Sequence, residues 1–175
     1  MRQIIASGLT AILIDVTPAL TSEVTVSVNK MSADRVGTLI GTIALKYSHH
    51  SMMVTPNLTS LPPGAHALHI HENPNCGAGM KSGKKVAGLM ASGHYNPTKV
   101  GHRKGMKHGH GMTPHGDLPN ITAGANVTAT KGVMTDKVKV DQIRGRAVMV
   151  HRYGTNEAGK PKGGGARFAC GVIPK

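Results

Sequence analysis

The stretch His66–Cys76, HALHIHENPNC, is the part of the chain around which we expect the fold to be organised. Within it, His69 and His71 lie two residues apart and are flanked by Leu68 and Ile70. Alternate residues of a β-strand share a face, so this pair directs two imidazoles to the same side. Such a pair suits a metal that favours nitrogen ligands, such as copper or zinc. The pair alone leaves open the alternative of two surface histidines on an edge strand.

The composition indicates an all-β domain with an unusual core. The chain has 175 residues, enough for one domain with a sizeable core. It has no Trp, one Phe and three Tyr, so its core must rely on aliphatic side chains and on its ten Met. Gly and Pro are frequent, with β-branched residues clustered between them. This pattern favours many short strands joined by tight turns.

The order of these strands follows from the hydrophobic pattern. Val24, Val26 and Val28 alternate with polar residues, which predicts a half-buried strand. Similar patterns predict further strands at 36–46, 51–56, around the His pair, 121–133 with a turn at 123–125, 146–151 and 166–173. The segments 77–93, 94–119 and 153–165 are expected to be loops, and 138–143 a short turn or helix. His49 and His50 fall at a hairpin tip and are expected to be exposed. Such a series of short strands is typical of a β-sandwich or barrel.

Cys76 and Cys170 are the only cysteines, and the compartment decides their state. In a reducing cytosol they would be two separate thiols, whereas in an exported protein they indicate one disulfide. Residues 1–21 favour export, because the apolar run Ile4–Ile14 is too short to span a membrane and is typical of a signal peptide. The alternative is an ordinary first strand. We expect a signal peptide over 1–21, a single domain over 22–175, and a periplasmic or otherwise secreted protein.

The formal net charge is +13, with only eight acidic residues. A basic excess is typical of proteins with anionic partners, such as nucleic acid, a membrane surface or a small anion. Charge alone does not choose among them.

Five motifs occur in a fixed order along the chain: LPPGAHALHIHENPNC, SGHYNP, HGDLPN, VMVH and GGGARFACGVI. Together they resemble the copper–zinc superoxide dismutases, most closely the secreted bacterial branch, over roughly residues 23–174. The resemblance implies a Greek-key β-barrel of about eight strands, with both metals held outside the barrel between long metal-binding and electrostatic loops. It also implies that a Cys76–Cys170 disulfide anchors the first motif to the last strand.

The resemblance further implies a copper site made of four histidines. These would be His69, His71, His94 and His151, with His94 bridging copper and zinc. An imidazole can bridge only when both nitrogens are deprotonated, which two cations make possible by lowering its pKa. His66 matches a family histidine that is not a ligand and ties a loop to a strand through hydrogen bonds.

The zinc ligands are less regular. His94 and His102 match the first two zinc ligands of the family, and Asp117 matches its carboxylate. The family places the remaining histidine three residues before the Asp, where this chain has a proline. His115 lies two residues before Asp117, and His110 lies eight residues after His102. Either could complete a tetrahedral zinc site, and we favour His115 with His110 as the alternative.

A second departure concerns an outer carboxylate. The family has an Asp four residues after the last copper histidine that hydrogen-bonds imidazoles of both metals, and Thr155 stands there in this chain. Losing such a carboxylate typically costs about 10–100-fold in metal affinity. Asn156 or Glu157 could replace it; otherwise zinc should bind weakly. A restored Asp would be expected to act between His71 and His102.

These residues imply dismutation of superoxide to O₂ and H₂O₂ with copper and zinc as cofactors. Arg167 matches the active-site arginine of the family and would hold the anion, while His94 would carry a proton. Lys160 and Lys162 lie in the loop expected to rim the channel, where positive charge speeds the arrival of an anion. The alternative function is a non-enzymatic protein of the same fold that stores or delivers copper or zinc. We further expect binding to anionic surfaces, no specific nucleic-acid partner, and a monomer or homodimer.

Overall fold

The computed structural model describes residues 22–100 and 113–175. The elements, in chain order, are β1 (Ser22–Met31), β2 (Val36–Ser48), β3 (Ser51–Leu58), β4 (Gly64–His71), β5 (Gly79–Lys81), β6 (Lys84–Val86), η1 (Leu89–Ala91), β7 (Asp117–Ala123), β8 (Val133–Thr135), α1 (Val140–Ile143), β9 (Ala147–His151), η2 (Lys162–Gly164) and β10 (Arg167–Val172). The prediction of a mostly β protein is confirmed. No helix in this described part is long and apolar enough to cross a membrane.

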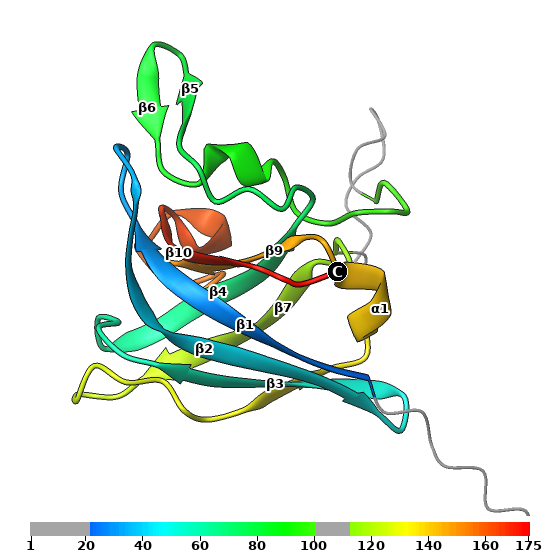
Figure 1. Ribbon diagram of the computed structural model, residues 1–175. Coiled ribbons are helices and arrows are strands. Elements are labelled where there is room, and N and C mark those ends of the chain that lie inside the picture. Colours follow the sequence, from blue (N-terminus) through cyan, green and yellow to red (C-terminus); the bar gives the residue numbers. More distant parts are fainter. Residues whose placement is uncertain (1–21, 101–112) are drawn as a thin grey trace, which may run out of the picture.

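Eight strands form one antiparallel sheet in the order β7-β4-β9-β10-β1-β2-β3-β8. Its two edge strands, β7 and β8, lie side by side, so the sheet curls into a nearly closed barrel, as Figure 1 shows. In the barrel, β8 and β7 lie between β3 and β4, so the connection from β3 to β4 passes over both positions. The connection from β8 to β9 likewise passes over β7 and β4. Such crossing connections define a Greek key, as the family resemblance implied.

The barrel interior is filled by aliphatic side chains. Val24, Val26 and Val28 of β1 are buried and alternate with exposed residues, because successive strand residues point to opposite faces. Leu68 and Ile70 of β4 enter the same core. The apolar half of the HALHIH stretch therefore faces the barrel, and His69 and His71 face outward.

A second, smaller core lies outside the barrel. It contains Met31, Ala91, Ala147, Met149 and Cys170, with Cys76 and Ala87 packed against it. Every residue of β9 is consequently buried, since both of its faces are covered. The segment from β4 to η1 thus forms a cover over the outer faces of β9 and β10.

The structure corrects two predicted segments. Residues 77–93 are not simply a loop, because β5 and β6 pair there as a separate two-stranded hairpin. This hairpin stands away from the barrel (Figure 1). The strand predicted at 121–133 is divided, since β7 ends at Ala123, Ala129 forms an isolated bridge with Leu58, and regular pairing resumes at Val133–Thr135, as β8.

Candidate metal centre

Strand pairing brings the predicted copper ligands together on the outer face of the barrel. His69 of β4 pairs with Asp117 of β7, and Arg167 of β10 pairs with His151 of β9. A single β-bridge joins His94, which is in a loop, to His71. Residues that are neighbours across strands share a face, so these side chains meet although up to 82 positions separate His69 from His151 in the sequence.

The four imidazoles converge closely enough to share one ion. Each of His69, His71, His94 and His151 offers a ligand atom, and these atoms lie within 4.8 Å of one another. Three of the rings are almost fully buried, with exposed fractions of 1%, 1% and 5% for His69, His71 and His151. All four predicted copper ligands are therefore brought together.

The buried ring nitrogens show that this cluster fits a metal. Nδ1 of His69, Nε2 of His71 and Nε2 of His151 are buried and have no hydrogen-bond partner. An unpartnered buried polar atom is costly, so three that face one point indicate a missing shared partner. Nitrogen ligands of this kind suit copper or zinc.

The opposite nitrogens of two rings are held by main-chain carbonyls. Nδ1 of His71 donates to the carbonyl oxygen of Ser92 at 2.9 Å, and Nδ1 of His151 donates to that of Gly165 at 2.9 Å. These bonds fix the tautomer that leaves Nε2 as a lone-pair donor. The structure records no comparable bond to Nε2 of His69 among the described residues.

Burial keeps these rings neutral. It lowers the pKa of His69 to about 2, with further lowering from the neighbouring His94 and His151. Burial likewise lowers the pKa of His71 to about 3 and that of His151 to about 4, against a partial opposing effect of their carbonyl partners. Because metal ligands must be deprotonated, the site is ready for an ion near neutral pH.

His66 lies beside the cluster and does not join it. Its Nδ1 lies 2.8 Å from the carbonyl oxygen of His151, and its Nε2 lies 2.7 Å from that of Pro62. Both ring nitrogens are thus engaged, which matches the structural role predicted for this residue.

The zinc side is partly assembled. Nδ1 of His94 and Oδ1 of Asp117 are 2.6 Å apart, so two of the predicted zinc ligands converge. His102 and the alternative ligand His110 lie outside the described residues. His115 is described, and its Nδ1 lies 3.4 Å from Oγ1 of Thr98. Among the described residues it does not come close enough to His94 and Asp117 to share one metal ion with them. The choice between His115 and His110 therefore stays a prediction.

Thr155 is hydrogen-bonded to strand β7, and no hydrogen bond joins it to an imidazole among the described residues. Its main-chain nitrogen and its Oγ1 both donate to Oδ1 of Asn120, at 3.2 and 2.7 Å. Glu157, one suggested replacement for the missing carboxylate, instead accepts from the main-chain nitrogen of Gly154 at 3.0 Å. His71 needs no carboxylate, because Ser92 already holds its Nδ1. The open nitrogen is Nε2 of His69, which sequence reasoning did not identify.

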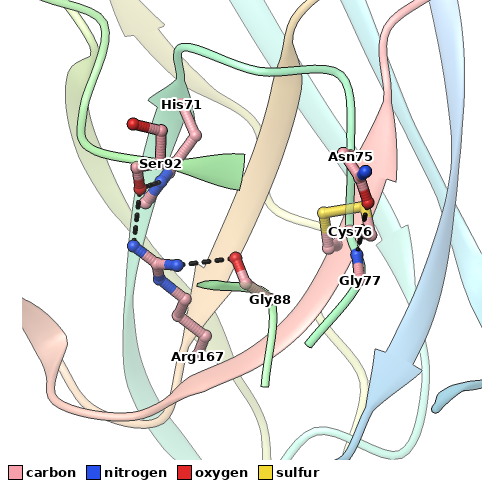
Figure 2. The surroundings of a disulfide bond; sticks show 8 residues. His71, Asn75, Cys76, Gly77, Gly88, Ser92 and Arg167 are labelled. Carbon is pink, nitrogen blue, oxygen red and sulfur yellow. Dashed lines mark hydrogen bonds between the residues drawn. A yellow bond between two sulfur atoms is a disulfide. The ribbon is translucent and has the colours of Figure 1, made fainter. Parts of the chain in front are cut away.

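Arg167 reaches toward Ser92 and Gly88 on the side of His71, as Figure 2 shows. Its Nη1 donates to the carbonyl oxygen of Gly88 and its Nη2 to that of Ser92, both at 2.6 Å. Burial lowers the pKa of this guanidinium from its usual value. Ser92 accepts from both Arg167 and His71, so one main-chain oxygen links the anion-binding candidate to a copper ligand.

The Cys76–Cys170 disulfide is present and links residues 94 positions apart, which confirms that prediction. It ties β10 to the segment that carries Gly88 and Ser92 (Figure 2). The bond therefore fixes both acceptors of Arg167 relative to the strand that bears Arg167.

A Greek-key barrel with four convergent imidazoles on its outer face defines a metalloprotein with a histidine-rich centre. The family model of copper/zinc superoxide dismutase matches residues 39–173. The chain is 38% identical to superoxide dismutase [Cu-Zn] 1 of Salmonella typhimurium over the full length of both, and 40% identical to the enzyme of Photobacterium leiognathi over 89% of this chain and 88% of that one. This chain belongs to the copper/zinc superoxide dismutase family.

Solved structures agree with this assignment. The Cu/Zn superoxide dismutase of Brucella abortus superposes with a TM-score of 0.75 at 36% identity, over 87% of this chain and 99% of the other. A monomeric copper, zinc superoxide dismutase from Salmonella enterica gives 0.74 at 36% identity, with the same coverage.

Proposed function

We propose that this protein dismutates superoxide to O₂ and H₂O₂ at a copper held by His69, His71, His94 and His151. The observation that carries the proposal is the set of three buried, unpartnered imidazole nitrogens that face one point. Membership of the copper/zinc superoxide dismutase family supports both the metal and the reaction.

Copper, when bound, supplies the one-electron chemistry, because it can accept an electron from one superoxide and return it to a second, which takes up two protons to form H₂O₂. The chain supplies the nitrogen ligands. His69, His71 and His151 remain neutral near pH 7 and present lone pairs from rigid strands. Their positions are set by the ladders that join β4 to β9 and β9 to β10, so little reorganisation is needed on loading.

His94 has a different role. Its Nδ1 is directed at Asp117, which leaves Nε2 for the copper side of the ring. In this proposal His94 would be a ligand shared by the copper and zinc sites, and its Nε2 would hold a proton for delivery to the substrate. Asp117, His102 and either His110 or His115 complete the zinc site.

Arg167 binds the substrate anion. It is held by two carbonyls, yet a guanidinium has five N–H donors, so donors remain for superoxide. The exposed Lys160 and Lys162 add positive charge near this strand, and they raise the arrival rate of an anion in a way that falls with salt.

The decisive experiment is stopped-flow decay of superoxide with protein loaded with copper and zinc. We expect rapid catalysed decay that slows with added salt, and loss of most of the catalysis in Arg167→Ala with copper still bound. Full copper loading without catalysed decay would reject the enzyme and favour the storage or delivery alternative. Catalysis that is unchanged in Arg167→Ala would reject the role of that residue.

An exported location is also proposed. A structural disulfide is typical of oxidising compartments, and residues 1–21 have the composition of a signal peptide. Fractionation of cells that express the full chain tests this, since protein recovered only from the cytosol with free thiols would contradict it. The monomeric state of the Salmonella enterica relative belongs to that protein, and the state of this chain stays a prediction.

Binding to anionic surfaces is the remaining proposal. The hairpin of β5 and β6 projects from the barrel and carries exposed Lys81, Lys84 and Lys85, with no acidic residue between 79 and 86. Co-sedimentation with vesicles that contain phosphatidylglycerol, and not with neutral phosphatidylcholine vesicles, is expected at low salt. Equal sedimentation with both would contradict it.

A further inference from the structure

An ion pair outside the ligand set joins the ends of two metal-bearing strands. Glu72 directly follows His71 at the end of β4, and Arg146 directly precedes β9, which ends in His151. Nη1 of Arg146 donates to Oε2 of Glu72 at 2.7 Å and to the carbonyl oxygen of Glu72 at 3.2 Å. Both side chains are partly shielded from solvent, so the pair is better defined than an ordinary surface ion pair.

The same pair also contacts Tyr95 and Asn96, the two residues after His94. The other oxygen of Glu72, Oε1, accepts the main-chain N–H of Asn96 at 3.0 Å. The guanidinium carbon of Arg146 lies 3.9 Å from the ring centroid of the buried Tyr95, in the geometry of a cation–π contact. Nε of Arg146 also donates to the carbonyl oxygen of Gln142 at 3.3 Å, which holds the guanidinium in place over the ring.

His94 needs such support more than the other three histidines do. His69 and His71 lie in the ladder of β4 and β9, and His151 pairs with Arg167 in the ladder of β9 and β10, whereas His94 lies in a loop with a single β-bridge to His71. Its ring must also meet two partners, the copper cluster on one side and Asp117 on the other. A small displacement of the loop would therefore disturb His94 before it disturbed the strand-borne ligands.

We infer that Glu72 and Arg146 are positioning residues that fix His94 between the two metal sites. This inference rests on the proposed function, in which His94 is shared by copper and zinc. Loss of the pair should weaken zinc more than copper. Copper retains three nitrogens on strands, while on the zinc side His94 and Asp117 are the two predicted ligands that converge among the described residues.

The chain offers a matched control two residues away. Arg144 forms an ion pair with Asp141 at 3.4 Å and donates to the carbonyl oxygen of Glu23. The structure records no contact of Arg144 with His94 or its neighbours. Arg144→Met thus removes a comparable charge from the same region without touching the loop. Glu72→Gln is the conservative variant, because an amide oxygen can still accept from Asn96 while the charge that binds Arg146 is gone.

The experiment measures zinc and copper affinities separately, by chelator competition on metal-free protein with its disulfide intact. We expect Arg146→Met to weaken zinc about 10-fold or more and copper by less than about threefold, in line with the effect of outer contacts on metal ligands. Arg144→Met should change neither. Amide hydrogen exchange gives a readout without metal: the Asn96 amide should exchange faster in Arg146→Met and stay protected in Arg144→Met.

Equal losses in Arg144→Met and Arg146→Met, or equal losses of zinc and copper, would overturn the positioning role. If Arg146→Met does not fold, Glu72→Gln carries the test, with a loss of zinc affinity expected and an unchanged zinc affinity contradicting the inference. His94→Ala tests the ligand assignment of His94 separately from the positioning role of Glu72 and Arg146. An unchanged zinc affinity in His94→Ala would reject the assignment of His94 as a zinc ligand. A lowered zinc affinity in His94→Ala together with a wild-type zinc affinity in Arg146→Met would reject only the positioning role.

Discussion

Acidification of the metal-free protein should destabilise it well before its carboxylates titrate. Burial lowers the pKa values of His69, His71 and His151 to about 2, 3 and 4, whereas each would be near 6.5 in the unfolded chain. Between these limits the unfolded chain binds more protons than the folded one, so stability falls as pH falls below about 6.5.

The size of this effect can be estimated at pH 5.5, which is above all three folded values. One pH unit below the unfolded pKa corresponds to about 1.4 kcal/mol for each imidazole, and therefore to roughly 4 kcal/mol for the three together. That is a large share of the about 5–15 kcal/mol by which domains are usually stable.

The assay is urea unfolding of chelator-treated, oxidised protein at pH 7.5 and 5.5. His151→Asn should reduce the difference between the two pH values by about 1.4 kcal/mol, because one titrating ring is removed. His49→Asn is the control, since His49 is exposed at a hairpin tip with a φ of 49°, a conformation that Asn tolerates. A wild-type difference below about 1 kcal/mol, or an equal change in both variants, would refute the picture of buried neutral imidazoles.

Three further outcomes are expected. Oxidised, denatured protein should show no maleimide-reactive thiol, and two reactive thiols per chain would contradict the disulfide. Cys170→Ser should lower the free energy of unfolding by up to about 4–5 kcal/mol, because the disulfide closes a loop of 94 positions. Arg167→Lys should retain copper but catalyse more slowly, since a point charge cannot donate to Gly88, Ser92 and the anion in one plane; wild-type rates would argue against that geometry. Thr155→Asp should tighten zinc more than copper, with Thr155→Asn as the uncharged control, and equal zinc affinities in both variants would show that no carboxylate is needed there.

Much of the fold could be predicted because its strands carry clear alternation. The valines of β1 and the HALHIH stretch separate an inward apolar face from an outward one, and both strands lie where the pattern indicated. The β5–β6 hairpin could not be found in this way. Its strands have three residues each, are rich in Gly and Lys, and pair only with one another, so no hydrophobic face marks them.

The copper cluster was predictable only through its motifs, since nothing in local spacing brings His151 to His69. Pairing of β4 with β9 does so, and that pairing depends on the whole barrel. The contact of Glu72 with Arg146 joins residues 74 positions apart and has no sequence signal at all. The hydrogen bond between Thr155 and Asn120 also has no sequence signal. It is formed by the residue that stands where the family has its carboxylate.

The position of bound copper tests the central claim most directly. Crystals of copper-loaded protein measured at the copper absorption edge should show one dominant anomalous peak among Nδ1 of His69, Nε2 of His71, Nε2 of His151 and the ring of His94, the atoms that converge in the structure. A dominant peak elsewhere, for example on His102 or His110, with the four-histidine cluster empty, would contradict the account.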